Sequence, residues 1–223
     1  LTLMICAALL AGGIGTRLDV GMPKQFYLIA GKPILIHSLE AFLKVEEMDE
    51  IIVSSPKECV NKTKDVIKEY DLTDPRITVI EGGKRRSDTI LNSINYTLEN
   101  DYPKDSIMVT HDAARIFVTP KLIKDSIRYA KQYGAASAVI PATDVIFESK
   151  KDGILTDVPD RQYLLQSQTP QSFNINHYIE IYSDLSDEEI DKLDEAMILF
   201  HMKLVYLKEI ELILKLQDHQ ILK

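Results

Sequence analysis

Glycines and basic residues follow the first apolar segment of the chain. Residues 4–10 are apolar and run into Ala11-Gly12-Gly13-Ile14-Gly15-Thr16-Arg17, and Pro23-Lys24-Gln25-Phe26 follows. Glycines let backbone N–H groups approach a polyphosphate closely, and Arg17 and Lys24 add positive charge in an acidic protein. Because open parallel sheets bind ligands where their strands end, the pattern predicts a nucleoside triphosphate site. The glycines alone would fit an ordinary strand-to-helix turn equally well.

Two common phosphate-binding patterns do not fit this loop. The Gly-Lys-Ser/Thr tripeptide of a Walker loop does not occur in the chain. Gly13 and Gly15 match the first two glycines of the dinucleotide fingerprint, but Leu18 stands where the third glycine allows close packing of strand and helix. The sequence therefore argues against a nicotinamide-dependent enzyme.

Three further polar segments are expected near the same edge of the sheet. They are Gly82-Gly83-Lys84-Arg85-Arg86-Ser87-Asp88-Thr89, His111-Asp112-Ala113-Ala114-Arg115 and Gln168-Thr169-Pro170-Gln171. The first could receive a base or ribose through backbone groups and Thr89. A helix cap made by Ser87 or Asp88 explains it equally well.

Asp112 is the candidate metal ligand. A carboxylate at the end of a buried strand, opposite a polyphosphate loop, can hold Mg²⁺, which takes oxygen ligands and substrate phosphates. Alone, such a residue would more often be a cap or an ion-pair partner. Arg115 could pair with Asp112 or with a second, anionic substrate. The five histidines show no metal-ligand spacing.

The composition limits the class of protein. A chain of 223 residues with 45% hydrophobic residues fits one large α/β domain. Its net charge of −8 disfavours nucleic-acid binding. Cys6 and Cys59 lie far apart, and Cys6 falls in an apolar strand pattern, so we expect a cytoplasmic protein with reduced thiols. No apolar run approaches the ~18 residues of a membrane span, and the start lacks the pattern of a signal peptide.

Strand-like and helix-like segments alternate along most of the chain. Strands are predicted over 4–10, 50–54, 77–81, 106–110 and 136–140, and helices over 61–70, 87–98 and 119–133. Repeated β-α-β units predict an α/β fold with a doubly wound, mainly parallel sheet, similar to Rossmann folds.

Residues 142–172 break this alternation. They form short apolar pieces on either side of the turn signal Lys150-Lys151-Asp152-Gly153, which predicts a projecting β-arm. An arm without its own core usually packs on a partner, so we expect a homodimer. A solvated surface hairpin is the alternative.

Together these motifs resemble those of the cytidylyltransferases that make CDP-alditols. The resemblance extends from about residue 4 to residue 195 and includes Gly31-Lys32-Pro33-Ile34 and Gln168-Thr169-Pro170-Gln171-Ser172-Phe173. One branch uses 2-C-methyl-D-erythritol 4-phosphate in isoprenoid synthesis, and the other uses D-ribitol 5-phosphate for teichoic acid or related polymers. Gly12-Gly13 and residues 140–144, 148–149, 156–159 and 182–189 look more like the ribitol branch. CDP-ribitol formation is therefore the main expectation, with the methylerythritol substrate as the alternative.

The resemblance implies roles for individual residues in transfer of a cytidylyl group from CTP. Arg17, Lys24 and Lys215 would be catalytic. Asp112 would hold Mg²⁺, and Arg115, Arg161 and Thr169 would face the polyol phosphate, with Arg161 reaching into the neighbouring subunit's site. The nucleotide would contact Leu10, Ala11, Gly12, Gly13, Gly15, Gly83, Lys84, Arg86, Thr89, Asp112 and Ala113.

The chain also departs from the family pattern. Ile116 replaces a proline, and Val145 and Leu193 replace threonines. From Lys208 the tail differs from the family's Asn-Ile-Lys-Ile-Thr strand; a one-base deletion in codon 208 would explain this and would leave Lys215 at the lysine position. A nucleotide-binding protein of impaired activity is therefore a further hypothesis.

Overall fold

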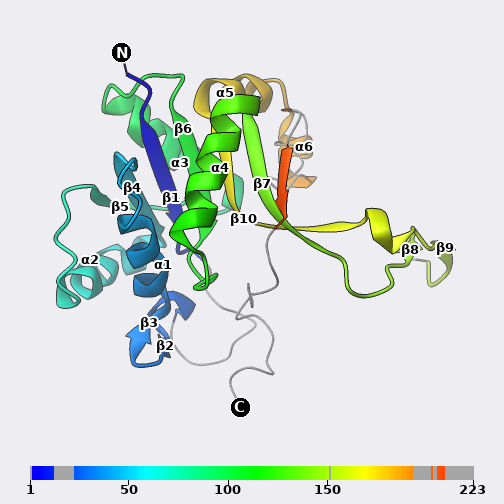
Figure 1. The fold of residues 1–223 in the computed structure, drawn as a ribbon, viewed down its shortest axis with the longest axis horizontal. Coiled ribbons are helices and arrows are strands. Elements are labelled where there is room, and N and C mark those ends of the chain that lie inside the picture. Colours follow the sequence, from blue (N-terminus) through cyan, green and yellow to red (C-terminus); the bar gives the residue numbers. More distant parts are fainter. Residues whose placement is uncertain (1, 13–22, 151, 193–201, 203–204, 209–223) are drawn as a thin grey trace.

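A seven-stranded sheet forms the centre of the molecule (Figure 1). The computed structural model describes residues 2–12, 23–150, 152–192, 202 and 205–208. The strands lie in the order β11-β7-β10-β6-β1-β4-β5. Their bounds are β1 (Ile5–Leu10), β4 (Glu50–Ser55), β5 (Ile77–Glu81), β6 (Ile107–Asp112), β7 (Ala135–Pro141), β10 (Leu165–Asn174) and β11 (Val205–Lys208).

Among the described strands of this sheet, β10 alone runs against its neighbours. It pairs antiparallel with β6 and β7, whereas the β1–β6, β1–β4, β4–β5 and β7–β11 pairs are parallel. The predicted mainly parallel, doubly wound sheet is thus confirmed. Each predicted strand and helix is present with bounds that differ by at most two residues.

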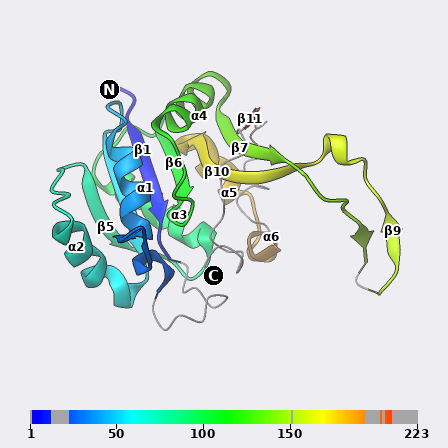
Figure 2. The ribbon, with the colours of Figure 1, turned by 60° about the horizontal axis from the view of Figure 1, so that its bottom comes forward.

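Helices cover both faces of the sheet (Figure 2). Their bounds are α1 (Ile34–Leu43), α2 (Val60–Glu69), α3 (Arg86–Glu99), α4 (Pro120–Tyr133), α5 (Ile175–Ser183) and α6 (Asp187–Lys192). One core cluster joins the sheet to apolar residues of α1, α2 and α4, and the other joins it to α3 and α5. Since both faces are covered, all but the last residue of β1 are fully buried, as its unbroken apolar sequence predicts.

Local sequence signals set the ends of α4. The Thr119 hydroxyl accepts a hydrogen bond from the Leu122 N–H at 3.2 Å, and Pro120 occupies the first helical turn. The helix ends before Gly134, whose φ of +93° favours glycine. These signals place the helix against the sheet, where Ile123, Ile127 and Ala130 are buried.

An arm projects from the sheet between β7 and β10 (Figures 1 and 2). It carries the antiparallel pair β8 (Glu148–Ser149) and β9 (Leu155–Asp157) and the single turn η3 (Arg161–Tyr163). The projecting part is shorter than the predicted 142–172, because β10 begins at Leu165 and continues into the sheet. The sequence does not reveal this, because β10 pairs with strands distant in sequence.

Large apolar side chains on the arm are exposed. More than half of the surface of each of these residues is accessible: Val145, Phe147, Ile154, Leu155, Val158 and Tyr163. The dimer predicted from this arm stays a prediction. Cys6 and Cys59 are buried, free thiols, as expected for Cys6. Among the described residues, none of the helices has the length and apolar character needed to span a bilayer.

Candidate active site

Three loops leave the carboxyl ends of neighbouring strands in register. The Ala11 N–H donates to the Ser54 carbonyl oxygen at 2.9 Å, and the Ala113 N–H donates to the Leu10 carbonyl oxygen at 3.1 Å. The Gly82 N–H donates to the Ser55 carbonyl oxygen at 2.8 Å. The sheet ladder therefore extends past the strand ends and brings three predicted segments to one edge.

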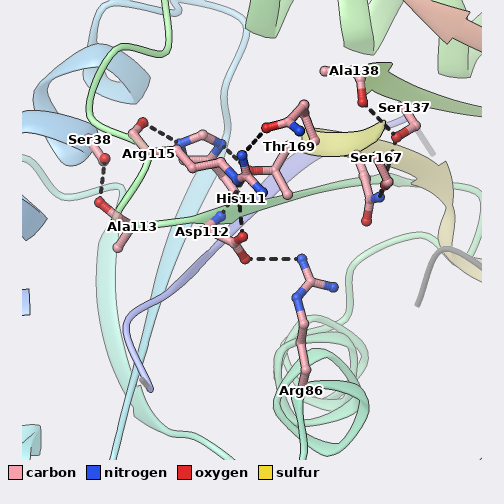
Figure 3. A network of polar contacts seen from close by, with 12 residues as sticks. Ser38, Arg86, His111, Asp112, Ala113, Arg115, Ser137, Ala138, Ser167 and Thr169 are labelled. Carbon is pink, nitrogen blue, oxygen red and sulfur yellow. Dashed lines mark hydrogen bonds and ion pairs between the residues drawn. The ribbon is translucent and has the colours of Figure 1, made fainter. Parts of the chain in front are cut away.

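Asp112 lies between two arginines at this edge (Figure 3). Its Oδ1 is 3.3 Å from Nη2 of Arg86, which starts α3, and its Oδ2 is 3.1 Å from Nε of Arg115. Burial alone would raise the pKa of this carboxyl group, but the nearby positive charges of Arg86 and Arg115 outweigh that effect and lower the pKa to about 2. Asp112 is therefore ionised at neutral pH.

Arg115 is fixed inside the protein rather than extended into solvent. It is 4% exposed, its Nε donates to Asp112, and its Nη1 donates to Oε1 of Gln168 on β10. The Arg115 N–H also donates to the Asp112 carbonyl oxygen at 2.9 Å. Of the two partners predicted for Arg115, the structure shows the carboxylate.

His111 connects Thr169 to the Arg115 backbone. The His111 Nδ1 lies 3.0 Å from the Thr169 Oγ1, and its Nε2 lies 3.1 Å from the Arg115 carbonyl oxygen. The Thr169 hydroxyl also accepts the Asp112 N–H at 3.2 Å. Complete burial lowers the pKa of His111 to about 4, so its imidazole is neutral. Figure 3 shows His111, Thr169 and Asp112 clustered together.

The loop before α3 requires glycine at position 83. A Cβ on Gly83 would lie 2.3 Å from the Cβ of Asp88 and 2.9 Å from the Thr89 nitrogen. The Thr89 hydroxyl accepts the Gly83 N–H and donates to the Arg85 carbonyl oxygen, each at 3.0 Å. The Asp88 carboxylate accepts the Arg85 N–H at 3.1 Å, so the alternative of an Asp88 cap is confirmed. Thr89 therefore shapes the loop, and Lys84 within it is exposed.

Lys24 is buried at the start of the single turn η1 (Lys24–Phe26) and is 8% exposed. Gly12 follows β1, and no described atom lies within 4 Å of the position that a Cβ on it would take. Four predicted site residues lie outside the described residues: Gly13, Gly15, Arg17 and Lys215. Leu193, which replaces a family threonine, lies outside them too.

Arg161 lies on the arm, in η3, and not beside Asp112 of its own chain. Its Nη1 donates to the Thr143 carbonyl oxygen at 2.8 Å, at the base of the arm. Val145, which replaces a family threonine, is 58% exposed on the same arm. A role for Arg161 in catalysis would therefore need a second subunit.

The residues around Asp112 suit a magnesium ion held largely by substrate. Among the described residues, no three His, Cys, Asp or Glu side chains group to hold a metal. Mg²⁺ in nucleotide enzymes is commonly held by one or two carboxylates, with substrate phosphates and water as the other ligands. An ionised Asp112 whose side chain is 25% exposed fits that donor set.

His111 and Gln168 were not among the predicted site residues. The alternation Ile107, Val109, His111 along β6 places all three side chains on one face of the sheet, where the first two join the α1 and α4 core. That alternation could have indicated a buried histidine. The contact between Gln168 and Arg115 joins positions 53 residues apart, and no local signal could have revealed it.

Comparison with known proteins identifies the family of this chain. A family model for 2-C-methyl-D-erythritol 4-phosphate cytidylyltransferase (IspD) matches residues 5–206. The chain belongs to the IspD family. This is a family of CTP-dependent cytidylyltransferases, so the protein is a nucleotidyltransferase, as predicted.

Solved structures of similar proteins share this fold. A 4-diphosphocytidyl-2C-methyl-D-erythritol synthase from Anaerococcus prevotii DSM 20548 is 20% identical, with a TM-score of 0.77 and coverage of 98% of this chain and 92% of that chain. The IspD of Francisella tularensis is 23% identical, with a TM-score of 0.79 and coverage of 98% and 96%. Another such synthase is 23% identical, with a TM-score of 0.77 and coverage of 99% and 96%. At these identities the likeness establishes the fold.

Proposed function

We propose that this IspD-family protein joins CTP to a polyol phosphate, forming a CDP-alditol and pyrophosphate. The observation that carries the proposal is the meeting of Asp112, Arg86, Arg115 and the Gly83 loop at one sheet edge, within a chain that matches the family over residues 5–206. A phosphate oxygen of the polyol phosphate would attack the α-phosphorus of CTP in line. The bond from that phosphorus to the pyrophosphate oxygen would break.

The chain's residues would act by position and charge. Such a transfer needs orientation of the phosphates and neutralisation of their charge more than covalent help. Lys24, and Arg17 by family resemblance, would neutralise the triphosphate. The backbone from Gly83 to Thr89 would receive cytosine and ribose. Asp112 would hold Mg²⁺, which when bound supplies neutralisation of phosphate charge.

The first candidate acceptor is 2-C-methyl-D-erythritol 4-phosphate. The matched family model and the similar structures carry the name of that substrate or of its product. D-ribitol 5-phosphate is the second candidate, because Gly12-Gly13 and residues 140–144, 148–149 and 156–159 resemble the ribitol branch. Both acceptors present a phosphate on a short polyol, so the same charged edge would serve either.

One assay separates these functions. Purified protein would be incubated with CTP, Mg²⁺ and each polyol phosphate in turn, and pyrophosphate release would be measured with the CDP-alditol identified by mass spectrometry. The acceptor with the higher kcat/KM is the substrate. Binding of CTP without pyrophosphate release from either acceptor would contradict the proposal and support a nucleotide-binding protein of impaired activity.

The arm would join two subunits. Its apolar side chains are exposed in the described part of the chain, and removing each from water would stabilise an interface. Sedimentation should therefore show a dimer, and Phe147→Asp should weaken it because a charge would enter that interface. The exposed Tyr133→Asp on α4 is the matched control. A wild-type protein that is monomeric and fully active would contradict an active site shared between two subunits.

A further inference from the structure

Four hydrogen bonds form a closed network at the end of β6. The Asp112 N–H donates to the Thr169 hydroxyl at 3.2 Å, and that hydroxyl contacts the His111 Nδ1 at 3.0 Å. The His111 Nε2 contacts the Arg115 carbonyl oxygen at 3.1 Å, and the Arg115 N–H returns to the Asp112 carbonyl oxygen at 2.9 Å. The network therefore joins β6, β10 and the loop that carries Arg115.

The direction of each bond follows from the number of hydrogens available. The Arg115 carbonyl oxygen can only accept, so the His111 Nε2 must carry a hydrogen. In a neutral imidazole the His111 Nδ1 is then an acceptor, and the hydrogen it receives is that of the Thr169 hydroxyl. Thr169 has one hydroxyl hydrogen, so it has none left to donate to a phosphate.

The network continues the contact between β6 and β10 beyond the last paired residues of the two strands. The pairing of β10 with β6 ends at Gln171 and Thr110, two residues before Asp112. The Thr169 side chain supplies the acceptor that the Asp112 N–H would otherwise lack. A buried N–H without an acceptor destabilises the fold, so this bond holds the two strands together beyond the last ladder pair.

We infer that His111 is a positioning residue for the cytidylyl transfer, because it orients the Thr169 hydroxyl toward itself and thereby holds the main chain of Asp112 and Arg115. The inference rests on the proposed function. Thr169 belongs to the same network, as an acceptor for the Asp112 N–H. The family resemblance implies instead that Thr169 faces the polyol phosphate, and the two roles predict different kinetics.

Kinetics of matched variants distinguish these roles. Thr169→Val removes the hydroxyl at nearly constant volume, Thr169→Ser keeps it, and His111→Phe keeps a ring against Phe42, 5.4 Å away between ring centroids. We expect Thr169→Val and His111→Phe each to lower kcat about tenfold or more, since small misplacements of a catalytic group have large effects. The KM for the polyol phosphate should change less than about twofold, because no substrate contact is lost. Thr169→Ser should restore most of kcat.

The double variant tests whether the two residues act as one unit. The double variant combines Thr169→Val with His111→Phe. If His111 acts through Thr169, its kcat should be no lower than that of the slower single variant, whereas independent effects on kcat would multiply. Thr97→Val is the control, because it removes a fully buried hydroxyl that donates to the Ile94 carbonyl oxygen at 2.7 Å. Thr97 lies about three turns along α3 from Arg86, so its variant should keep the wild-type kcat.

A spectroscopic measurement tests the bond directly. In protein labelled with ¹⁵N-histidine, the signals of His111, assigned by their loss in His111→Phe, should show the neutral tautomer with hydrogen on Nε2. Thr169→Val should shift the Nδ1 signal, because its donor is gone. Circular dichroism of each variant checks that the fold is retained.

Several results would overturn the inference. A Thr169→Val enzyme with an unchanged kcat and a raised KM for the polyol phosphate would place Thr169 on the substrate. Multiplicative losses in the double variant, or a His111 tautomer with hydrogen on Nδ1, would also contradict it. If wild-type protein releases no pyrophosphate with either acceptor, the proposed function fails, and the NMR spectrum still decides whether His111 holds Thr169.

Discussion

The sheet edge around Asp112 and the β-arm differ in how far their side chains are buried and paired within one chain. At the sheet edge the charges of Asp112, Arg86 and Arg115 are paired within one chain, and Arg115 is 4% exposed. On the arm, Phe147 and Ile154 are 56% and 65% exposed. One region already holds its charged groups in place, whereas the other presents apolar surface that a second molecule could cover.

The difference follows from how each region is built. The sheet edge combines the ends of strands that are distant in sequence and fixed by pairing on both sides. The arm consists of two strands of two and three residues, which are too short to form a core of their own. We therefore expect substitutions at the sheet edge to affect nucleotide chemistry and substitutions on the arm to affect the second substrate.

Lys24→Ala should reduce the rate of pyrophosphate release more than any other substitution proposed. Lys24 is 8% exposed and follows the glycine-rich loop, where its charge would stabilise the triphosphate during transfer. Preorganised charges of this kind contribute ~10²-fold or more to rate, so pyrophosphate release should fall at least that far while the circular dichroism spectrum is retained. Lys57→Ala, an exposed lysine that begins another single turn, should be near normal. Near-normal turnover by Lys24→Ala would contradict a catalytic role for Lys24.

Asp112→Asn should abolish the part of CTP binding that depends on Mg²⁺. An amide keeps the shape of the side chain but lacks the charge that a hard dication requires. Calorimetric titrations of CTP with and without Mg²⁺ measure this difference. Asp125→Asn is a matched control, because Asp125 also pairs with two cations, Lys121 and Arg128, on the outer surface of α4. Unchanged metal-dependent affinity would make Asp112 a structural residue.

The lowered pKa of Asp112 should also make the stability of the protein depend on pH, and Asp112→Asn is the variant that tests this. The folded-state pKa of Asp112 is about 2, below its ordinary value near 3.9, so its ionisation stabilises the folded state above about pH 4. This contribution should be lost as the pH falls from about 4 to 2. The difference in unfolding free energy between wild type and Asp112→Asn should shrink over that interval, and a constant difference would contradict the ion pairs.

Gly83→Ala should have an intermediate effect on the nucleotide. The new Cβ would lie 2.3 Å from the Cβ of Asp88, so the loop or the start of α3 must move. Overpacking of this kind costs roughly 1–3 kcal/mol, and we expect the KM for CTP to rise about tenfold. Gly153→Ala is the control on the arm: its φ of +84° also makes alanine strained, but no described atom lies within 4 Å of the added Cβ, so it tests whether glycine strain far from the nucleotide has this effect. Equal KM values for CTP in the two variants would contradict a contact between the Gly83 loop and the nucleotide.

The smallest effect is expected for Arg161→Lys. An arginine can hold a phosphate through two parallel hydrogen bonds, which lysine cannot reproduce. The KM for the polyol phosphate should therefore rise more than the KM for CTP. Dimerisation measured by sedimentation should be unchanged, because one exposed charge contributes little to an interface. A KM that rises equally for both substrates would place Arg161 outside the polyol pocket.

Local patterns in the sequence were sufficient for the elements of the sheet and for part of the site. The apolar run before Gly12 is typical of a strand buried on both faces, and the Thr119-Pro120 pair and Gly134 mark the two ends of α4. Because parallel strands end at one edge, the position of Asp112 after a predicted strand was enough to place it there. These signals involve neighbours in the chain or the regular geometry of a β-α-β unit.

Local patterns do not reveal which groups meet at that edge. The contacts of Asp112 with Arg86, Arg115 with Gln168 and His111 with Thr169 join segments 26, 53 and 58 residues apart. The antiparallel insertion of β10 between β6 and β7 creates the last two contacts, and no periodicity in residues 165–174 indicates which strands it will join. The strand, the loop and the charge follow from local sequence, since each depends on local geometry. The tertiary structure decided their partners, because pairing across a sheet is set by the packing of the whole chain.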